Sequence, residues 1–311
     1  MVFVAGAKSI PDFLSEIESY LVATGDWETA DDQVTNGIAL RHIPTNNYLS
    51  IVKKVHRTEK NDPDPRSTGL KIALSSEWDS VSHLPSGSVY YVHAGLFEAW
   101  YWGGHSYTET YLNNYMDADN TYNISYWVDK YGLICAIANP NSYNPANNTG
   151  ATATVGCFFA IEYIPVAGRE FNDGLSDFYL ITAQNWKPRN INENAGGFAH
   201  SCARPYSLMT PSRLYDQHER GAIKSAGNGK VYFEFPLYFN DSARTIVSAQ
   251  SKRWFLVAQN VGIAISDVIS WIDEANAITR KFYVAEVNSA NRAEKFAVAI
   301  PYENAFEYPT V

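Results

Sequence analysis

The first apolar positions of the chain repeat with the period of an α-helix. Between residues 10 and 22, five apolar side chains share one helical face: Phe13, Leu14, Ile17, Tyr20 and Leu21. Ser9 suits an N-cap, Pro11 suits a first turn and Gly25 follows the last apolar position. The pattern predicts a strand and a short helix within residues 1–25.

Beyond the helix, apolar and polar residues alternate with the period of two that is typical of strands. In the first half the expected strands are residues 38–42, 48–55, 70–74, 89–93, 124–128, 133–138 and 155–164. In the second half they are residues 232–239, 245–248, 254–259, 282–287 and 296–300. Turns are expected where Asn, Asp, Pro and Gly gather, at residues 61–65, 85–87 and 139–150. Residues 263–277 also fit a second helix, because Ile265, Val268, Ile269 and Ile272 would share a face.

Composition and charge narrow the classes of protein to which the chain can belong. The 311 residues are 46% hydrophobic and 14% aromatic, which supports a large core and favours sheets. The net charge of −9, with no run of basic residues, argues against direct binding of nucleic acid. No apolar stretch is long enough for a membrane span, and no signal peptide is recognisable, so we expect a soluble protein that makes no membrane contact. Cys135 and Cys157 lie in apolar runs and are expected to be small buried side chains, as suits assembly in a reducing cytoplasm.

Two segments of the chain resemble each other. Residues 120–139 and 240–260 each read as a strand, a polar turn containing Lys, and a strand, and each precedes a similar third strand at residues 158–162 and 282–286. Such a meander must pack its apolar face on a neighbour. We therefore predict an α+β, β-dominated fold, with a short N-terminal helix followed by two related, sandwich-like antiparallel β modules. The predicted boundaries are residues 1–25, 26–168 and 169–311.

Several of these features resemble a loosely defined family of virion structural proteins of tailed bacteriophages. The similar segments are the opening Phe3-Val-Ala-Gly6, the helix with its following Gly25-Asp-Trp27, and the hairpin from Tyr126 to Ile137. An aromatic strand like residues 157–162 follows the hairpin in that family. The resemblance implies a role in assembly of the tail, neck or baseplate and brings no catalytic residues with it. The Asn-rich insertion before Gly150 and the region 171–220 depart from the family pattern.

Motifs for chemistry are missing or incomplete in the sequence. No nucleophile elbow, zinc-protease helix or phosphate-binding glycine loop occurs. The segment that begins at Asp117 resembles the start of a calcium loop but has Tyr122 and Val128 where the loop needs Gly and Glu. His93 and His105 could meet a metal only through folding, since no pair of histidines has ligand spacing. We therefore expect no cofactor and no metal.

A carboxylate pair for glycan hydrolysis remains open, because 33 acidic residues leave many combinations. The acids nearest to the aromatic-rich part of the chain are Glu77, Asp79, Glu98, Glu109 and Asp129. Solvated surface positions explain them better than catalysis does.

The strongest local anomaly is an aromatic segment without cations. Nine Trp and Tyr residues and no Lys or Arg stand between Trp100 and Trp127. Such side chains suit protein interfaces and sugar rings, or they are divided between the core and the surface of the first module, whereas nucleic acid also needs cations. The candidate interface or glycan-binding residues are Trp100, Tyr101, Trp102, Tyr107, Tyr111 and Tyr115.

Together these features predict a non-enzymatic structural component of a tailed-phage virion, assembled in the host cytoplasm. Its expected partners are further copies of itself and other tail, neck or baseplate proteins. Two alternatives remain from the sequence: a receptor- or carbohydrate-binding tail module, and a glycan hydrolase.

Overall fold

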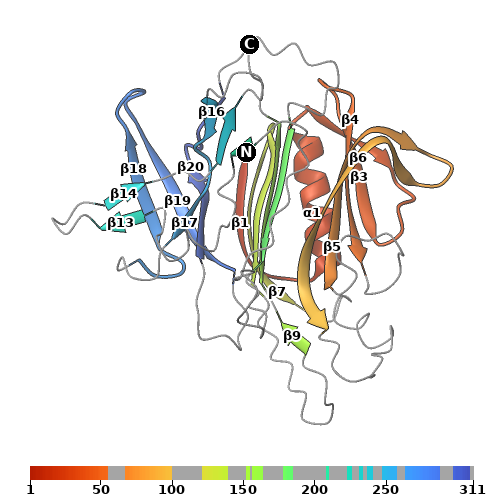
Figure 1. The fold of residues 1–311 in the computed structure, drawn as a ribbon, viewed down its shortest axis with the longest axis horizontal. Helices are drawn as coiled ribbons and strands as arrows, with labels where there is room; N and C mark the ends of the chain where they lie inside the picture. The colour runs from red at the N-terminus through yellow and green to blue at the C-terminus, as the bar shows by residue number, and fades with distance from the viewer. Residues whose placement is uncertain are drawn as a thin grey trace.

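The computed structural model shows a β-dominated α+β fold with one helix among the described residues, as the sequence predicts (Figure 1). The described residues are 1–54, 67–99, 121–138, 152–154, 156–163, 178–184, 208–209, 223–225, 231–233, 237–240, 247–257, 263–287 and 297–308. Every strand pair among them is antiparallel.

The helix α1 (Ile10–Ala23) begins and ends where its sequence predicts. The Ser9 side chain accepts a hydrogen bond from the backbone N–H of Asp12, and Pro11 lies in the first turn. The buried face consists of Ile10, Phe13, Leu14, Ile17 and Leu21. Local sequence therefore determines this element, and its apolar stripe fixes which side faces the core.

A six-stranded sheet covers one side of α1. Its order is β2-β3-β4-β5-β6-β9, with bounds Trp27–Asp31, Gly37–His42, Asn47–Lys54, Ser67–Asp79, Leu84–Ala99 and Thr152–Thr154. β5 and β6 form a hairpin much longer than expected, and the predicted turn at residues 85–87 lies inside β6. Gly87 has φ +70° beside the register shift between Ser75 and Glu77, so its turn-like sequence marks a β-bulge.

The central layer is a five-stranded sheet. Its order is β1-β7-β8-β10-β11, with bounds Val2–Lys8, Tyr122–Asp129, Gly132–Ala138, Cys157–Tyr163 and Phe178–Gln184. Every residue of β8 is buried, and so is every residue of β10 except its last. Alternate side chains enter two separate cores, which explains the continuous apolar runs of these strands. Cys135 and Cys157 are free and fully buried, as expected.

A four-stranded sheet packs on the other face of the central layer. Its order is β17-β20-β19-β18, with bounds Phe255–Val257, Ala297–Glu303, Ile278–Glu286 and Val268–Asp273. The helix suggested for residues 263–277 is wrong, because β18 occupies this stretch and pairs along its whole length with β19. Its exposure alternates along the strand, with Ile269 and Trp271 facing the core.

Two smaller sheets complete the described part. One has the order β12-β15-β16 (Leu208–Met209, Leu237–Asn240, Val247–Ser251), and the other pairs β13 (Ile223–Ser225) with β14 (Val231–Phe233). The strand expected at residues 232–239 is thus two strands in different sheets.

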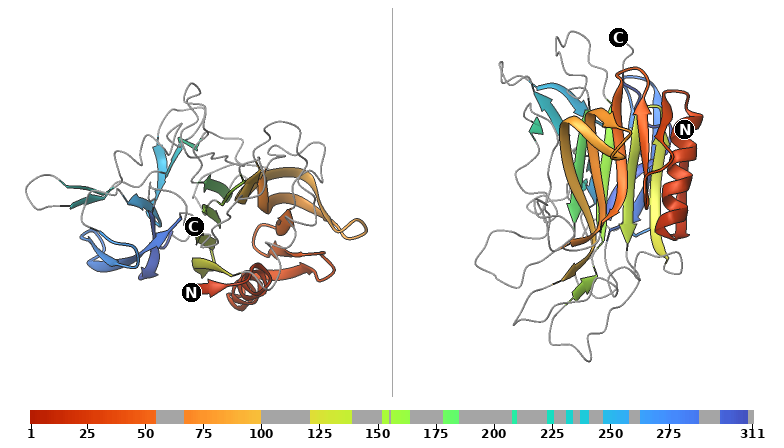
Figure 2. Two further views of the ribbon diagram at one scale, coloured as in Figure 1. Left: turned by 90° about the horizontal axis from the view of Figure 1, so that it is seen from below. Right: turned by 90° about the vertical axis from the view of Figure 1, so that its right-hand side faces the viewer.

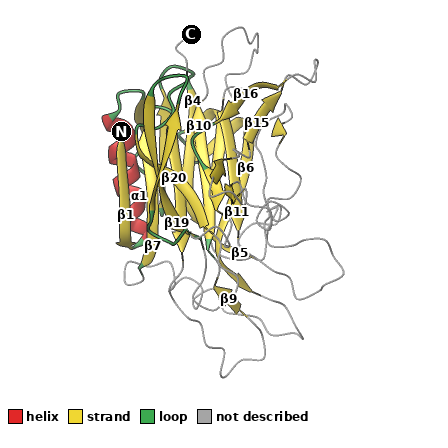
Figure 3. Cartoon of the chain, turned by 90° about the vertical axis from the view of Figure 1, so that its left-hand side faces the viewer, coloured by secondary structure: helices red, strands yellow, loops and turns green. Residues whose placement is uncertain are grey.

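The three large sheets lie side by side as layers (Figure 2). Seen from below, α1 lies between the six-stranded sheet and the central sheet, with the four-stranded sheet on the opposite side. Figure 3 shows α1 at one end of this stack of strands. One core fills the space around α1, and a second core fills the space between the central and four-stranded sheets.

The predicted repeat has the expected pairing in its first copy only. β7 and β8 form a hairpin, and β10 pairs directly with β8. In the second copy, β16 and β17 belong to different sheets, and β20 lies between β17 and β19. The meander predicted for residues 240–286 is therefore wrong, although both copies contribute strands to packed antiparallel sheets.

The central sheet takes strands from all three predicted segments. β1 from residues 1–25 pairs with β7, and β11 from residues 169–311 pairs with β10. The hydrogen bonding of this layer thus continues across both predicted boundaries.

Candidate functional site

The six candidate aromatic residues Trp100, Tyr101, Trp102, Tyr107, Tyr111 and Tyr115 lie outside the described residues. Three further members of the same aromatic segment are described: Tyr122, Tyr126 and Trp127 are at most 2% exposed. Tyr122 and Tyr126 line the core around α1, whereas Trp127 enters the second core. The end of the segment therefore builds the interior rather than a binding surface, and the role of its first part stays a prediction.

Two of the acidic residues considered for glycan hydrolysis, Glu77 and Asp79, lie at the end of β5. Glu77 is exposed on β5, and the Asp79 carboxylate accepts hydrogen bonds from Ser82 Oγ (2.6 Å) and the Val81 N–H (2.9 Å). These bonds lower the pKa of Asp79 and stabilise the turn between β5 and β6. The side chain of Glu98 and all of Glu109 lie outside the description.

Asp129 belongs to a buried charged cluster that sequence reasoning missed. Arg253 is 1% exposed and lies between two carboxylates, with Nη2 2.5 Å from Asp129 Oδ2 and Nε 2.5 Å from Glu162 Oε1. Burial raises the pKa of Glu162 to about 8, although the positive charge of Arg253 opposes the rise.

Aromatic and backbone groups enclose the same guanidinium. The rings of Tyr131 and Tyr308 lie 5.0 and 5.7 Å from it, and Arg253 also donates to the carbonyl of Phe306. The Asp129 carboxylate accepts further bonds from Trp127 Nε1 and the Tyr131 N–H, both 2.9 Å. The cluster therefore fastens the central sheet to the chain around the four-stranded sheet, and its acids have no open side toward a substrate.

The closed end of the β5–β6 hairpin presents two exposed apolar side chains, Val81 in the turn (89% exposed) and Leu84 at the start of β6 (59% exposed), which we call the tip surface. Its position is fixed by Asp31 on β2, whose Oδ2 accepts from Trp78 Nε1 (2.9 Å) and lies 2.7 Å from His83 Nδ1. These bonds lower the pKa of Asp31, with the His83 contact as the largest cause. The tip surface is therefore held by polar contacts beneath it.

A second exposed apolar surface lies on the hairpin of β18 and β19. It consists of Val268 (45% exposed) and Ile272 (66%), and we call it the hairpin surface; Ile278 (38%) pairs with Asp273 and lies on the other face of the hairpin. β18 is the last strand of its sheet, so one of its edges has no hydrogen-bonded strand among the described residues. Exposed apolar side chains beside an open edge are typical of a strand that pairs with another chain.

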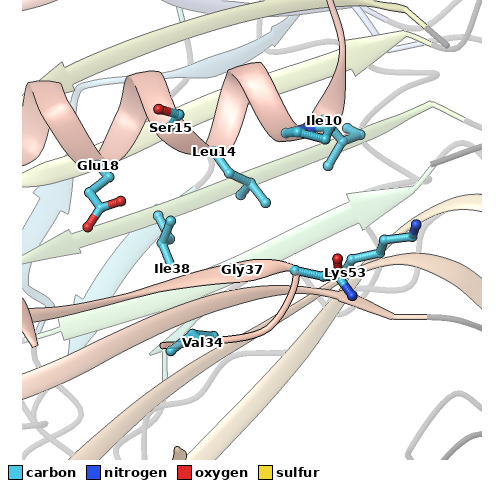
Figure 4. Close-up of a pocket in the computed structure, with 10 residues that line it drawn as sticks. Ile10, Leu14, Ser15, Glu18, Val34, Gly37, Ile38 and Lys53 are labelled. Atoms are coloured by element: carbon cyan, nitrogen blue, oxygen red, sulfur yellow. The ribbon is translucent and has the colours of Figure 1, made fainter. Parts of the chain in front are cut away.

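A cavity of about 330 Å³ lies between α1 and the start of β3 (Figure 4). Its apolar lining includes Ile10, Leu14 and Ile38, while Glu18 and Lys53 lie toward opposite ends (Figure 4). A single carboxylate is too few ligands for a metal ion. Within the described residues, no group of three or more His, Cys, Asp or Glu side chains is placed to hold one.

His42 is a buried neutral histidine rather than a ligand. Its ring is 1% exposed and contacts Trp27, Tyr163 and Phe178 at 4.7 to 5.1 Å between centroids. Burial lowers its pKa to about 4. His93 is described only by its backbone, and His105 lies outside the described residues.

No protein-family model matches this chain, and no curated protein matches its sequence. Across the described residues, no helix combines the length and the apolar character that a membrane span requires.

Proposed function

We propose that the protein is a non-enzymatic structural component of a tailed-phage virion, in the tail, neck or baseplate. It forms a homo-oligomer in the host cytoplasm and docks on other virion proteins. The support from the sequence is the resemblance of the N-terminal segment and of the hairpin that is β7 and β8.

The observation that carries the proposal is the presence of two separate apolar surfaces. The tip surface and the hairpin surface lie toward opposite ends of the longest axis (Figure 1). Isolated exposed apolar residues are ordinary, but Val81 and Ile272 each have a second apolar side chain nearby on the same hairpin. If partner proteins cover the tip surface and the hairpin surface, each molecule has two neighbours, as a component of a continuous assembly does.

The polar clusters of the described part support a structural role. Arg253 joins two sheets, and Asp31 holds the tip surface. Glu16 on α1 joins the helix to the central sheet, because Oε2 accepts from Tyr126 (2.5 Å) and Oε1 from Lys8 (2.7 Å). These contacts of each cluster join one part of the molecule to another.

The test is the location and the oligomeric state of the protein. Mass spectrometry of washed phage particles from a host infected with the encoding phage is expected to detect the chain in a fixed ratio to the other virion proteins. Light scattering of the purified protein during gel filtration is expected to give a mass above 34.8 kDa. A protein that stays monomeric and is absent from washed particles would overturn the proposal.

A further inference from the structure

The edge strands of the three large sheets differ in how they are protected. β2 carries a register shift and the acidic Glu28 and Asp31, while β9 and β17 have only three residues each. The exposed residues of β1 within its strand are small, and the two described side chains of β11 are buried. Bulges, charges and short length are the usual devices that keep edges from pairing.

β18 has none of these devices along its first five residues. It pairs with β19 over six residues without a shift of register, and it contains no proline, lysine or arginine. Its exposed side chains include Val268 and Ile272, which lie on the same side because side chains alternate. This edge is therefore suited to accept another strand.

We propose that two copies of this chain pair antiparallel through β18 across a two-fold axis at Ser270. This pairing rests on the proposed function, because it names the contact that forms the homo-oligomer. The four-stranded sheets of the two copies then become one continuous sheet, a contact in which the same patch serves both partners.

The sequence of β18 is self-complementary about this axis. Val268 of one copy comes opposite Ile272 of the other, and Ile269 comes opposite Trp271. A two-fold axis perpendicular to the sheet leaves the exposed faces of both copies on the same side of the joined sheet. Exposed apolar residues therefore come opposite exposed apolar residues, and core-facing residues come opposite core-facing residues. Apolar cross-strand pairs of this type stabilise an antiparallel pair of strands.

The charges that flank β18 weaken this register only at its two ends. Asp273 forms an ion pair with Arg280 of its own chain at 2.9 Å, which balances its charge. The Asp267 carboxylate accepts the backbone N–H of Ala264 at 2.7 Å. In this register Asp267 of one copy comes opposite Asp273 of the other; Arg280 balances Asp273, whereas Asp267 is exposed and adds a solvated like charge at each end of the paired strands, which lowers the affinity. Because the paired strands are short, we expect a dissociation constant of about micromolar order in solution.

The first experiment is sedimentation velocity of the full chain over a range of concentrations. The unmodified protein is expected to dimerise as its concentration rises, and Ile272→Lys is expected to weaken the dimer at least tenfold, since it places a charge on the edge. Val81→Lys is the matched control, because it changes an equally exposed apolar residue on the tip surface. Circular dichroism checks that both variants fold.

The second experiment locates the axis. Ser270→Cys is expected to form a disulfide-linked dimer under mild oxidation, because residues opposite each other across an antiparallel pair have Cβ atoms only ~5 Å apart. Thr279→Cys is the matched control, since Thr279 is exposed on the same hairpin but lies one strand farther from the axis.

The pairing is overturned by equal cross-linking of the two cysteine variants, by a dimer that Ile272→Lys leaves unchanged, or by a monomer at every concentration. If the Ile272→Lys variant still forms the oligomer and still enters particles, the β18 pairing is wrong but the proposed structural role stands. A chain that is monomeric and absent from particles removes both.

Discussion

Replacement of Arg253 by methionine is expected to destabilise the protein strongly, because Arg253 is the shared counter-ion of Asp129 and Glu162. Methionine occupies part of the same space but leaves two buried carboxylates without a cation. Removing one partner of a buried ion pair costs about 3–5 kcal/mol. Glu162 can hold a proton, since its pKa is raised to about 8, so we expect a loss near the lower end, about 3 kcal/mol, in the free energy of unfolding at neutral pH.

The assay is urea unfolding followed by tryptophan fluorescence, because Trp127 and Trp254 lie in the core beside the cluster. The midpoint is expected to fall while the slope with urea stays the same. Arg41→Met is the matched control. Arg41 pairs with Glu28 at 2.6 Å, but their side chains are 37% and 46% exposed, so this change is expected to cost less than about 1 kcal/mol.

A double-mutant cycle tests whether the cluster acts as a unit. Asp129→Asn is expected to cost less in the Arg253→Met background than in the unmodified protein, because the carboxylate has then already lost its counter-ion. Equal losses for Arg253→Met and Arg41→Met, or strictly additive losses in the cycle, would refute the reasoning.

Three further predictions concern other contacts. Burial raises the folded-state pKa of Glu162 from 4.5 to about 8, so this stabilisation is complete below the unfolded value and is lost as the pH rises through about 8. Thermal melts are expected to show a melting temperature that falls between about pH 5 and pH 8 and levels off above about pH 9, and Glu162→Gln should remove this part of the slope. Tyr126→Phe deletes the 2.5 Å bond to Glu16 and is expected to lower the free energy of unfolding by about 1 kcal/mol in urea titrations, whereas an unchanged midpoint would contradict the bond. Gly132→Ala is expected to cost about 3 kcal/mol or more, because Gly132 has φ +139° and a Cβ there would lie 2.1 Å from the Ile161 carbonyl oxygen; a stable variant with normal expression would contradict this geometry.

Elements that depend on local signals could be predicted from the sequence. The Ser9 cap, Pro11 and the apolar stripe determine α1 without help from the rest of the chain. The inner strands β7, β8 and β10 of the central sheet could also be predicted, because burial on both faces requires continuous apolar runs, whereas the edge strand β11 was missed. The stretch that became β18 misled the prediction, since its apolar residues fit a helical face as well as an alternating strand. Its pairing with β19 decided the outcome.

Contacts between distant parts of the chain could not be predicted in this way. Arg253 and Asp129 are 124 positions apart, and no spacing rule relates them. The insertion of β20 between β17 and β19 is likewise a matter of topology, which composition and periodicity do not encode. The open edge of β18 follows from the same arrangement, so the hairpin surface also required the structure.

The pairing of β1 with β7 has a consequence for synthesis on the ribosome. Val2 pairs with Val128, so β1 leaves the ribosome more than a hundred residues before its partner strand exists. The second core needs still later strands, and the carbonyl of Phe306 near the end of the chain completes the contacts of Arg253. Folding of so non-local a topology is slow, and a partly made chain exposes the apolar face of the central sheet. We therefore expect nascent chains of this protein to depend on chaperones until the last strands have been made.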